Sequence, residues 1–140
     1  MNKVFLDSDV LLDLLLDRTP FSDDIAAIIE VSIDSEVKLC TSPVSITNIR
    51  YIIGRLENKS KADLKTKKLL QIVDMENIGQ TVIDRAVSSK FKDFEDSVQN
   101  YCAEESGHNI IITRNTKDYK ESTLSIFTPK EYFAKIRNKK

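Results

Sequence analysis

A short apolar run that ends in an aspartate constrains the fold of this chain more than any other feature. Residues 4–6, with the sequence VFL, are apolar without alternation, which is typical of a strand buried on both faces of a sheet. Asp7 ends the run and residues 8–16 then have helical spacing, so the stretch predicts a strand followed directly by a helix. In an open parallel sheet, ligands bind just beyond the carboxyl ends of the strands. Asp7 is therefore expected where such folds do chemistry, although capping of the helix by Asp7 or Ser8 explains it equally well.

The remainder of the chain alternates between apolar runs and stretches of helical spacing. Strands are predicted at residues 37–40, 74–78, 109–113 and 125–127, and helices at 22–35, 43–57, 64–73, 81–88, 92–106 and 129–137. Residues 59–63 are predicted to be a polar link, and His108 a surface turn residue after the helix-ending Gly107. Strands that alternate with helices indicate an α/β fold with a parallel central sheet flanked by helices.

Length and composition narrow the class of protein. A chain of 140 residues is long enough for a core and is expected to form one domain over residues 1–140. A formal net charge of -1 gives no overall attraction to nucleic acid, so contacts with RNA would have to come from local patches. Cys40 and Cys102 form no metal-binding or redox motif, which favours a reducing interior. With no signal peptide and no apolar stretch of membrane-spanning length, the chain is expected to be cytoplasmic and free of the membrane.

Three polar stretches are expected to meet at the carboxyl edge of the sheet, at residues 7–9, 92–96 and 113–115. Asp93 and Asp96 are three residues apart and share a helix face, whereas Glu95 is expected to point elsewhere. Stabilisation of these acids by the helix dipole is one explanation for them. The other is a hard cation such as Mg²⁺ or Mn²⁺, which binds oxygen ligands, activates water and stabilises charge on a phosphate.

These stretches also resemble a known family. FLDSDVLLD at residues 5–13, DFEDSVQ at 93–99 and IIITRNTKDY at 110–119 resemble, in order and spacing, the motifs of the PIN domain. In particular they are similar to the VapC-like ribonucleases of bacterial toxin–antitoxin systems. The resemblance covers nearly the whole chain and implies a PIN-like three-layer sandwich. It also implies that acidic positions hold one or two divalent metal ions for the hydrolysis of RNA phosphodiester bonds.

The resemblance assigns roles to individual residues. It places the first family acid at Asp7 and the acid of the late helix at Asp96, with Asp93 one turn earlier as a helper. At the other two acidic positions this chain has Asn48 and Asn115, which offer carbonyl oxygens to a metal but no negative charge. A lower charge weakens a site for a hard cation. The carboxylates that would restore the lost charge are Asp9, Asp93 and Asp118.

The implied activity is that of a Mg²⁺- or Mn²⁺-dependent endoribonuclease, the toxin of a toxin–antitoxin pair. Its partners would be an RNA substrate, an antitoxin protein that covers the site and a second copy of the chain. Arg50, Arg55 and Arg114 are expected nearer the acidic site than the lysines, and they are the predicted phosphate contacts.

Two other functions fit parts of the sequence. With Asn48 and Asn115 in place of acids, the chain fits a PIN-like module that binds RNA or a protein partner without cutting. The Asp7-x-Asp9 pair also resembles the nucleophile and acid/base of haloacid-dehalogenase-type phosphatases, with Thr113 as their strand-end threonine. No strand that ends in paired acids follows Thr113, however, and 140 residues is short for that fold.

Overall fold

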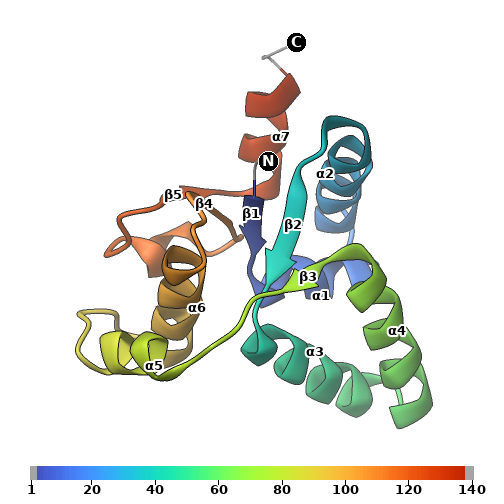
Figure 1. The fold of residues 1–140 in the computed structure, drawn as a ribbon. Helices are drawn as coiled ribbons and strands as arrows, with labels where there is room; N and C mark the ends of the chain where they lie inside the picture. Colours follow the sequence, from blue (N-terminus) through green and yellow to red (C-terminus); the bar gives the residue numbers. More distant parts are fainter. Residues whose placement is uncertain (1–2, 138–140) are drawn as a thin grey trace.

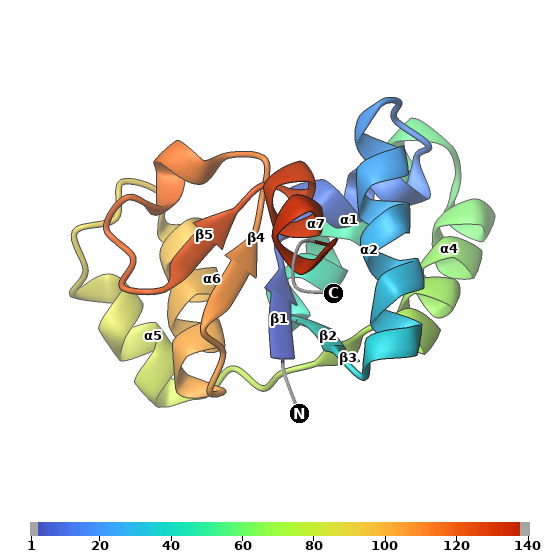
Figure 2. The same ribbon diagram turned by 90° about the horizontal axis from the view of Figure 1, so that it is seen from above.

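Five short parallel strands form the centre of the fold in a computed structural model that describes residues 3–137. Their order in the sheet is β3-β2-β1-β4-β5, so the first strand lies in the middle (Figures 1 and 2). Because every neighbouring pair is parallel, all the carboxyl ends lie at one edge. The strands are β1 (Lys3–Leu6), β2 (Lys38–Thr41), β3 (Asp74–Met75), β4 (Ile110–Ile112) and β5 (Ser125–Phe127).

Helices cover both faces of this sheet. In Figure 1, α5 and α6 lie on one side of the strands, and α2 and α4 on the other. The helices are α1 (Ser8–Leu15), α2 (Phe21–Ser35), α3 (Pro43–Leu56), α4 (Lys59–Ile72), α5 (Gln80–Val87), α6 (Phe94–Glu105) and α7 (Pro129–Arg137), with a 3₁₀ turn, η1 (Thr116–Tyr119). Within residues 3–137, no helix is long and apolar enough to cross a membrane.

The side chains of β1 divide the core into two layers. Val4 and Leu6 pack into a cluster with residues of α1, α2, α3, α4 and α7. Phe5, between them, points to the opposite face and packs with residues of α5 and α6. This alternation gives helix, sheet and helix layers, and β1 is buried on both faces because helices cover both. The predicted α/β sandwich with a parallel central sheet is confirmed.

Two sequence predictions about connecting segments are wrong. Residues 59–63 are not a polar link but the first turns of α4, because the Asn58 side chain accepts a hydrogen bond from the Lys61 amide and caps the helix. His108 is not a surface residue, since it is 2% exposed and its ring meets that of Phe5 edge-on, with centroids 5.7 Å apart. The turn at Gly107 directs the chain into the sheet rather than along the surface.

Strand exits lie side by side at the carboxyl edge. The Asp7 amide donates a hydrogen bond to the Ile112 carbonyl across 3.0 Å, and the Thr113 amide donates to the Phe127 carbonyl across 2.9 Å. The residue after β1 is therefore tied to the end of β4, and the residue after β4 to the end of β5. This registration brings Asp7 and Thr113 together from opposite ends of the sequence.

Gly107 ends α6 in the left-handed backbone region, with a φ of +83°. We expect Gly107→Ala to lower the free energy of unfolding by about 1 kcal/mol, because a Cβ strains this conformation. Urea unfolding followed by circular dichroism measures the change. Gly79→Ala is the matched control, because Gly79 has a φ of -114° and open space where its Cβ would stand. Equal losses in the two variants would contradict the role of backbone strain.

Candidate active site

Asp7 lies at the base of the carboxyl edge, held by four hydrogen-bond donors. Its Oδ1 accepts from the Ser8 amide at 2.8 Å and from Gln99 Nε2 at 3.2 Å. Its Oδ2 accepts from the Thr113 hydroxyl at 2.9 Å and from the Tyr119 hydroxyl at 3.0 Å. Burial, and then the charge of Asp7, raise the pKa of Tyr119 well above its usual value, so Tyr119 stays a donor. Asp7 thus caps α1, as the sequence allowed, and is also the centre of a wider polar network.

Gln99 connects this network to two further elements. Its amide group donates to Asp7 and to the Ser45 hydroxyl, while its carbonyl oxygen accepts from the Ser42 hydroxyl. Ser42 in turn caps α3 by accepting from the Ser45 amide at 3.1 Å. Gln99 is fully buried, so these bonds fix α6 against the start of α3 and the end of β1. Sequence reasoning missed Gln99, although it stands three residues after Asp96 and therefore on the same helix face.

Asp9, in the first turn of α1, brings a second carboxylate to the edge. Its Oδ2 accepts from the Arg114 amide at 3.0 Å and from Asn115 Nδ2 at 3.1 Å. The Thr113 hydroxyl lies 3.2 Å from the same oxygen, so its single proton is shared between Asp9 and Asp7. Burial, and then the neighbouring Asp7 charge, raise the pKa of Asp9 to about 6. The other oxygen, Oδ1, is buried without a hydrogen-bond partner among residues 3–137.

Asp93 and Asp96 stand at the start of α6, as the sequence predicted. Asp93 Oδ1 accepts from the Asp96 amide at 2.9 Å and so caps the helix. The Asp96 carboxylate is not used in this way. Burial raises its pKa to about 7, and the charges of Asp7, Asp93 and Asp118 act in the same direction. Asp96 is therefore an acidic side chain whose charge is uncompensated.

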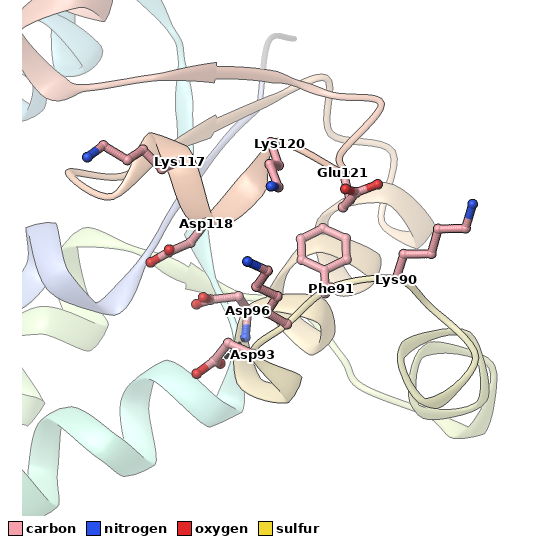
Figure 3. Close-up of a pocket in the computed structure, with 9 residues that line it drawn as sticks. Lys90, Phe91, Asp93, Asp96, Lys117, Asp118, Lys120 and Glu121 are labelled. Carbon is pink, nitrogen blue, oxygen red and sulfur yellow. Dashed lines mark hydrogen bonds between the residues drawn. The ribbon is translucent and has the colours of Figure 1, made fainter.

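Asp96 also lines an open cavity of about 600 Å³. Figure 3 shows the Asp93, Asp96 and Asp118 carboxylates on the same side of this cavity, the first two from the start of α6 and the third from η1. Four lysines also line this cavity, and none of them is among the predicted phosphate contacts. They are Lys90, Lys92, Lys117 and Lys120.

Glu95 does not point away from the site, contrary to the prediction. Its Oε1 accepts from Asn48 Nδ2 at 2.6 Å, a contact between α6 and α3. Burial raises the pKa of Glu95, and the charges of Asp93 and Asp7 raise it further. The helix-wheel argument placed Glu95 off the Asp93–Asp96 face, but α3 lies next to that flank and brings the side chain back to the acids. A carboxylate from α6 thus stands beside Asn48, where the family resemblance expects an acid.

The two asparagines are both near the acids. Asn48 contacts Glu95 and Asn115 contacts Asp9, in each case through the amide nitrogen. Each amide therefore donates to a carboxylate and keeps its carbonyl oxygen as an acceptor. Asp9 and Asp118, which the sequence offered as replacements for the lost charge, both lie close enough to raise the pKa of another acid or to have their own raised by one.

The three arginines predicted as phosphate contacts are each bound to a neighbour. Arg114 donates two hydrogen bonds to the buried carboxylate of Asp13, from Nε at 2.5 Å and from Nη2 at 3.1 Å. Arg50 Nε is 2.6 Å from Asp63, and Arg55 donates to the Tyr51 hydroxyl at 3.1 Å. None of the three is among the residues that line the cavity beside Asp96 in the described chain.

These features fit a divalent cation with oxygen ligands. The unpartnered Asp9 Oδ1 and the half-buried Asp96 are oxygens without a donor to match their charge. Asp7, Asp9, Glu95 and Asp96 are called the carboxylate site below. Burial raises the pKa values of the last three, and the charge of Asp7 raises each of them further. A hard cation would offset these effects, because carboxylate and amide oxygens are the ligands that Mg²⁺ and Mn²⁺ prefer.

Comparisons with known proteins agree with this geometry. The family model of the PIN domain matches residues 3–117. The chain belongs to the PIN-domain family. This match contradicts the haloacid-dehalogenase-type alternative, because one PIN-domain model spans the first two motifs and the third as far as residue 117.

The chain is similar to individual PIN-domain proteins as well. It is 25% identical over 135 residues to the protein named Ribonuclease VapC1 of Aquifex aeolicus (strain VF5), which covers 93% of this chain and 92% of that protein. Its fold is similar to VapBC2 from Rickettsia felis bound to a DNA fragment from their promoter, with a TM-score of 0.73, 11% identity and coverage of 89% of this chain and 96% of that chain. DNA-bound VapBC from Salmonella typhimurium gives a TM-score of 0.73 at 10% identity, over 92% of this chain and 99% of that chain.

The raised pKa values predict how stability depends on pH. In a chelator, the free energy of unfolding should fall as the pH rises from about 4 to 7. In that range the folded chain still holds the protons of Asp9 and Asp96, whose pKa values are about 6 and about 7, while the unfolded chain has released them. Asp96→Asn should therefore raise the melting temperature at pH 8 and change it little at pH 5.

Asp34→Asn on the exposed surface of α2 is the control, and its effect should be the same at both pH values. An Asp96→Asn variant that is less stable than the wild type at pH 8 would show that Asp96 is not repelled by its neighbours.

Proposed function

We propose that this protein is a metal-dependent ribonuclease that hydrolyses RNA phosphodiester bonds. The observation that carries the proposal is the carboxylate site, which gathers four acids from the exit of β1, from α1 and from α6. One of them, Asp96, lines an open cavity whose four lysines, Lys90, Lys92, Lys117 and Lys120, are called the lysine rim below. The family match and the similarity to Ribonuclease VapC1 support the reaction class. The site differs from the family pattern because two of its acids, Asp9 and Glu95, stand in for the charges that Asn115 and Asn48 lack.

Asp7, Asp9 and Asp96 would hold the cation, with Glu95 and the Asn48 and Asn115 carbonyl oxygens at the margin. Bound Mg²⁺ or Mn²⁺ supplies an activated water and stabilises charge on the phosphate. The chain itself fixes the ligands. Thr113, Tyr119 and Gln99 orient Asp7 through hydrogen bonds, as outer residues do in other metal sites. Asp93 caps α6 and so positions Asp96, which makes Asp93 a supporting residue.

The lysine rim is our proposed contact surface for the RNA backbone. Lys90, Lys92, Lys117 and Lys120 line the same cavity as Asp96, and their charge attracts phosphates without reading sequence. Arg50, Arg55 and Arg114 remain proposed contacts of lower rank, because each would have to leave its present partner. Arg114 in particular holds a buried Asp13, and breaking such a pair is costly.

We further propose that the protein acts in the cytoplasm as the toxin of a toxin–antitoxin pair. Similar folds were solved as VapBC complexes, and an antitoxin that covers the lysine rim and the acids would keep the site inactive. A homodimer and a single domain over residues 1–140 are the assembly and organisation that we propose for the chain.

Asp96→Asn should lower the rate of RNA cleavage by roughly 100-fold or more, since it removes a negative charge that would hold the catalytic cation. It should also abolish any growth arrest that expression of the wild type causes. Cleavage of a mixed RNA pool by purified protein in Mn²⁺ is the measurement, with Asp34→Asn as the carboxylate-to-amide control that keeps full activity.

Cleavage that Asp96→Asn leaves unchanged would overturn the assignment. RNA binding without cleavage, and without dependence on divalent cations, would instead favour the module that binds but does not cut. Such a binding module is the second candidate function, and the presence of Asn48 and Asn115 in place of acids supports it.

Glu95→Gln tests whether an acid on α6 replaces the acid missing from α3. The variant keeps the shape of the side chain and can still bond to Asn48, but it loses the charge. We expect cleavage to fall by about 10- to 100-fold and the Mn²⁺ concentration for half-maximal activity to rise. The double variant Glu95→Gln with Asn48→Asp should recover activity, because the charge returns on the neighbouring helix. Full activity of Glu95→Gln alone would refute this role.

A further inference from the structure

A cysteine, a glutamate and a histidine meet inside the molecule, apart from the carboxylate site. Cys40 lies in β2, Glu76 follows β3, and His108 lies between α6 and β4. One ligand atom of each lies within 4.8 Å of those of the other two. The carboxylate site is at the start of α6 and His108 is beyond its end, so most of the helix, about 14 Å from Asp96 to Glu105, lies between the two.

The three side chains converge on the sheet face that α6 covers. Cys40 is in register with Phe5, and the Phe5 ring meets that of His108 edge-on with centroids 5.7 Å apart. Cys40 and His108 are buried, whereas the Glu76 side chain is 18% exposed. Glu76 also lines an open cavity of about 420 Å³, together with Ser106 and others. Two members of the cluster are therefore buried, and the third faces this cavity.

Its hydrogen bonding is incomplete. Glu76 Oε2 is 2.6 Å from His108 Nε2, and Lys3 Nζ is 3.8 Å from the same oxygen while donating to the Ser106 carbonyl at 3.2 Å. The other ring nitrogen, His108 Nδ1, is buried with no hydrogen-bond partner among residues 3–137. A neutral imidazole ring carries its proton on one nitrogen and keeps a lone pair on the other, and that lone pair can bind a metal.

We propose that Cys40, Glu76 and His108 bind one divalent transition-metal ion of the zinc class. Sulfur, imidazole nitrogen and a carboxylate oxygen are ligands of zinc, which takes four in a tetrahedron, and water entering beside Glu76 would be the fourth. Mg²⁺ and Mn²⁺ prefer sites made of oxygen alone, so the two sites of this protein select different metals. As the sulfur–metal bond forms, the Cys40 thiol proton leaves to solvent. His108 Nε2 would exchange its hydrogen bond to Glu76 for the metal, and its proton would pass to Nδ1, so the ring stays neutral.

Cys102, the other free cysteine of the chain, serves as an internal control. It is buried in α6, and its thiol points to the Asn77 carbonyl at 3.7 Å rather than completing the cluster.

A metal on the three proposed ligands would connect β2, the β3–α5 connection and the α6–β4 connection to one another. It would therefore stabilise the folded chain, by about 100-fold in the unfolding equilibrium at a free metal concentration 100 times the Kd.

The test is a titration of the full chain, stripped with a chelator, with Co²⁺ as a spectroscopic probe and then with Zn²⁺. We expect one equivalent of Co²⁺ to give a near-ultraviolet thiolate-to-cobalt charge-transfer band that Zn²⁺ abolishes, and Zn²⁺ to raise the melting temperature. Cys40→Ser should lose the band, and Glu76→Gln should weaken Co²⁺ binding by about 10-fold or more. Cys102→Ser and Asp96→Asn should keep the band, which separates this site from the carboxylate site.

Absence of the band in the wild type would overturn the proposal, because a metal at this cluster must contact the Cys40 sulfur. A band that survives Cys40→Ser, or one that Cys102→Ser removes, would overturn it too by assigning the metal to the other thiol. If Cys40→Ser does not fold, the partly exposed Glu76→Gln decides, since unchanged Co²⁺ affinity in that variant contradicts the ligand set.

Discussion

Repulsion between carboxylates at one edge of the sheet is the constraint on which the rest of the structure depends. Burial raises the pKa values of Asp9 and Asp96, and the charge of Asp7 raises both further, so ionising these acids side by side is costly. Four donors to Asp7 offset part of this cost and come from α1, α6, the end of β4 and η1. The acids are therefore held together by the same hydrogen bonds that hold the elements together.

This arrangement links the fold to a function. The parallel register places the exits of β1 and β4 side by side, and Gln99 fixes the start of α6 against both β1 and α3. Without a bound cation, neutral groups in place of the unpartnered Asp9 oxygen and the half-buried Asp96 would make the folded chain more stable. That the chain keeps both is the physical reason to infer a bound cation at this edge.

The sequence predicted those parts of the site that local rules determine. Asp7 follows an apolar run and Asp96 stands in the first turn of a helix, and both signals lie within a few residues of the acid concerned. Glu95 was misplaced because its partner Asn48 is 47 residues away, and no local pattern encodes that contact. The burial of His108 was missed for the same reason, since the turn at Gly107 does not reveal what covers it.

Calorimetric titration of Mn²⁺ into the chelator-treated protein and into Asp7→Asn tests the central claim most directly. The Asp7 side chain accepts its hydrogen bonds from Ser8, Gln99, Thr113 and Tyr119, and none comes from the cluster of Cys40, Glu76 and His108. Our account predicts saturable binding in the wild type that Asp7→Asn removes. Absence of binding at millimolar Mn²⁺, or equal binding by the two proteins, would contradict a metal centre at the carboxyl edge of the sheet.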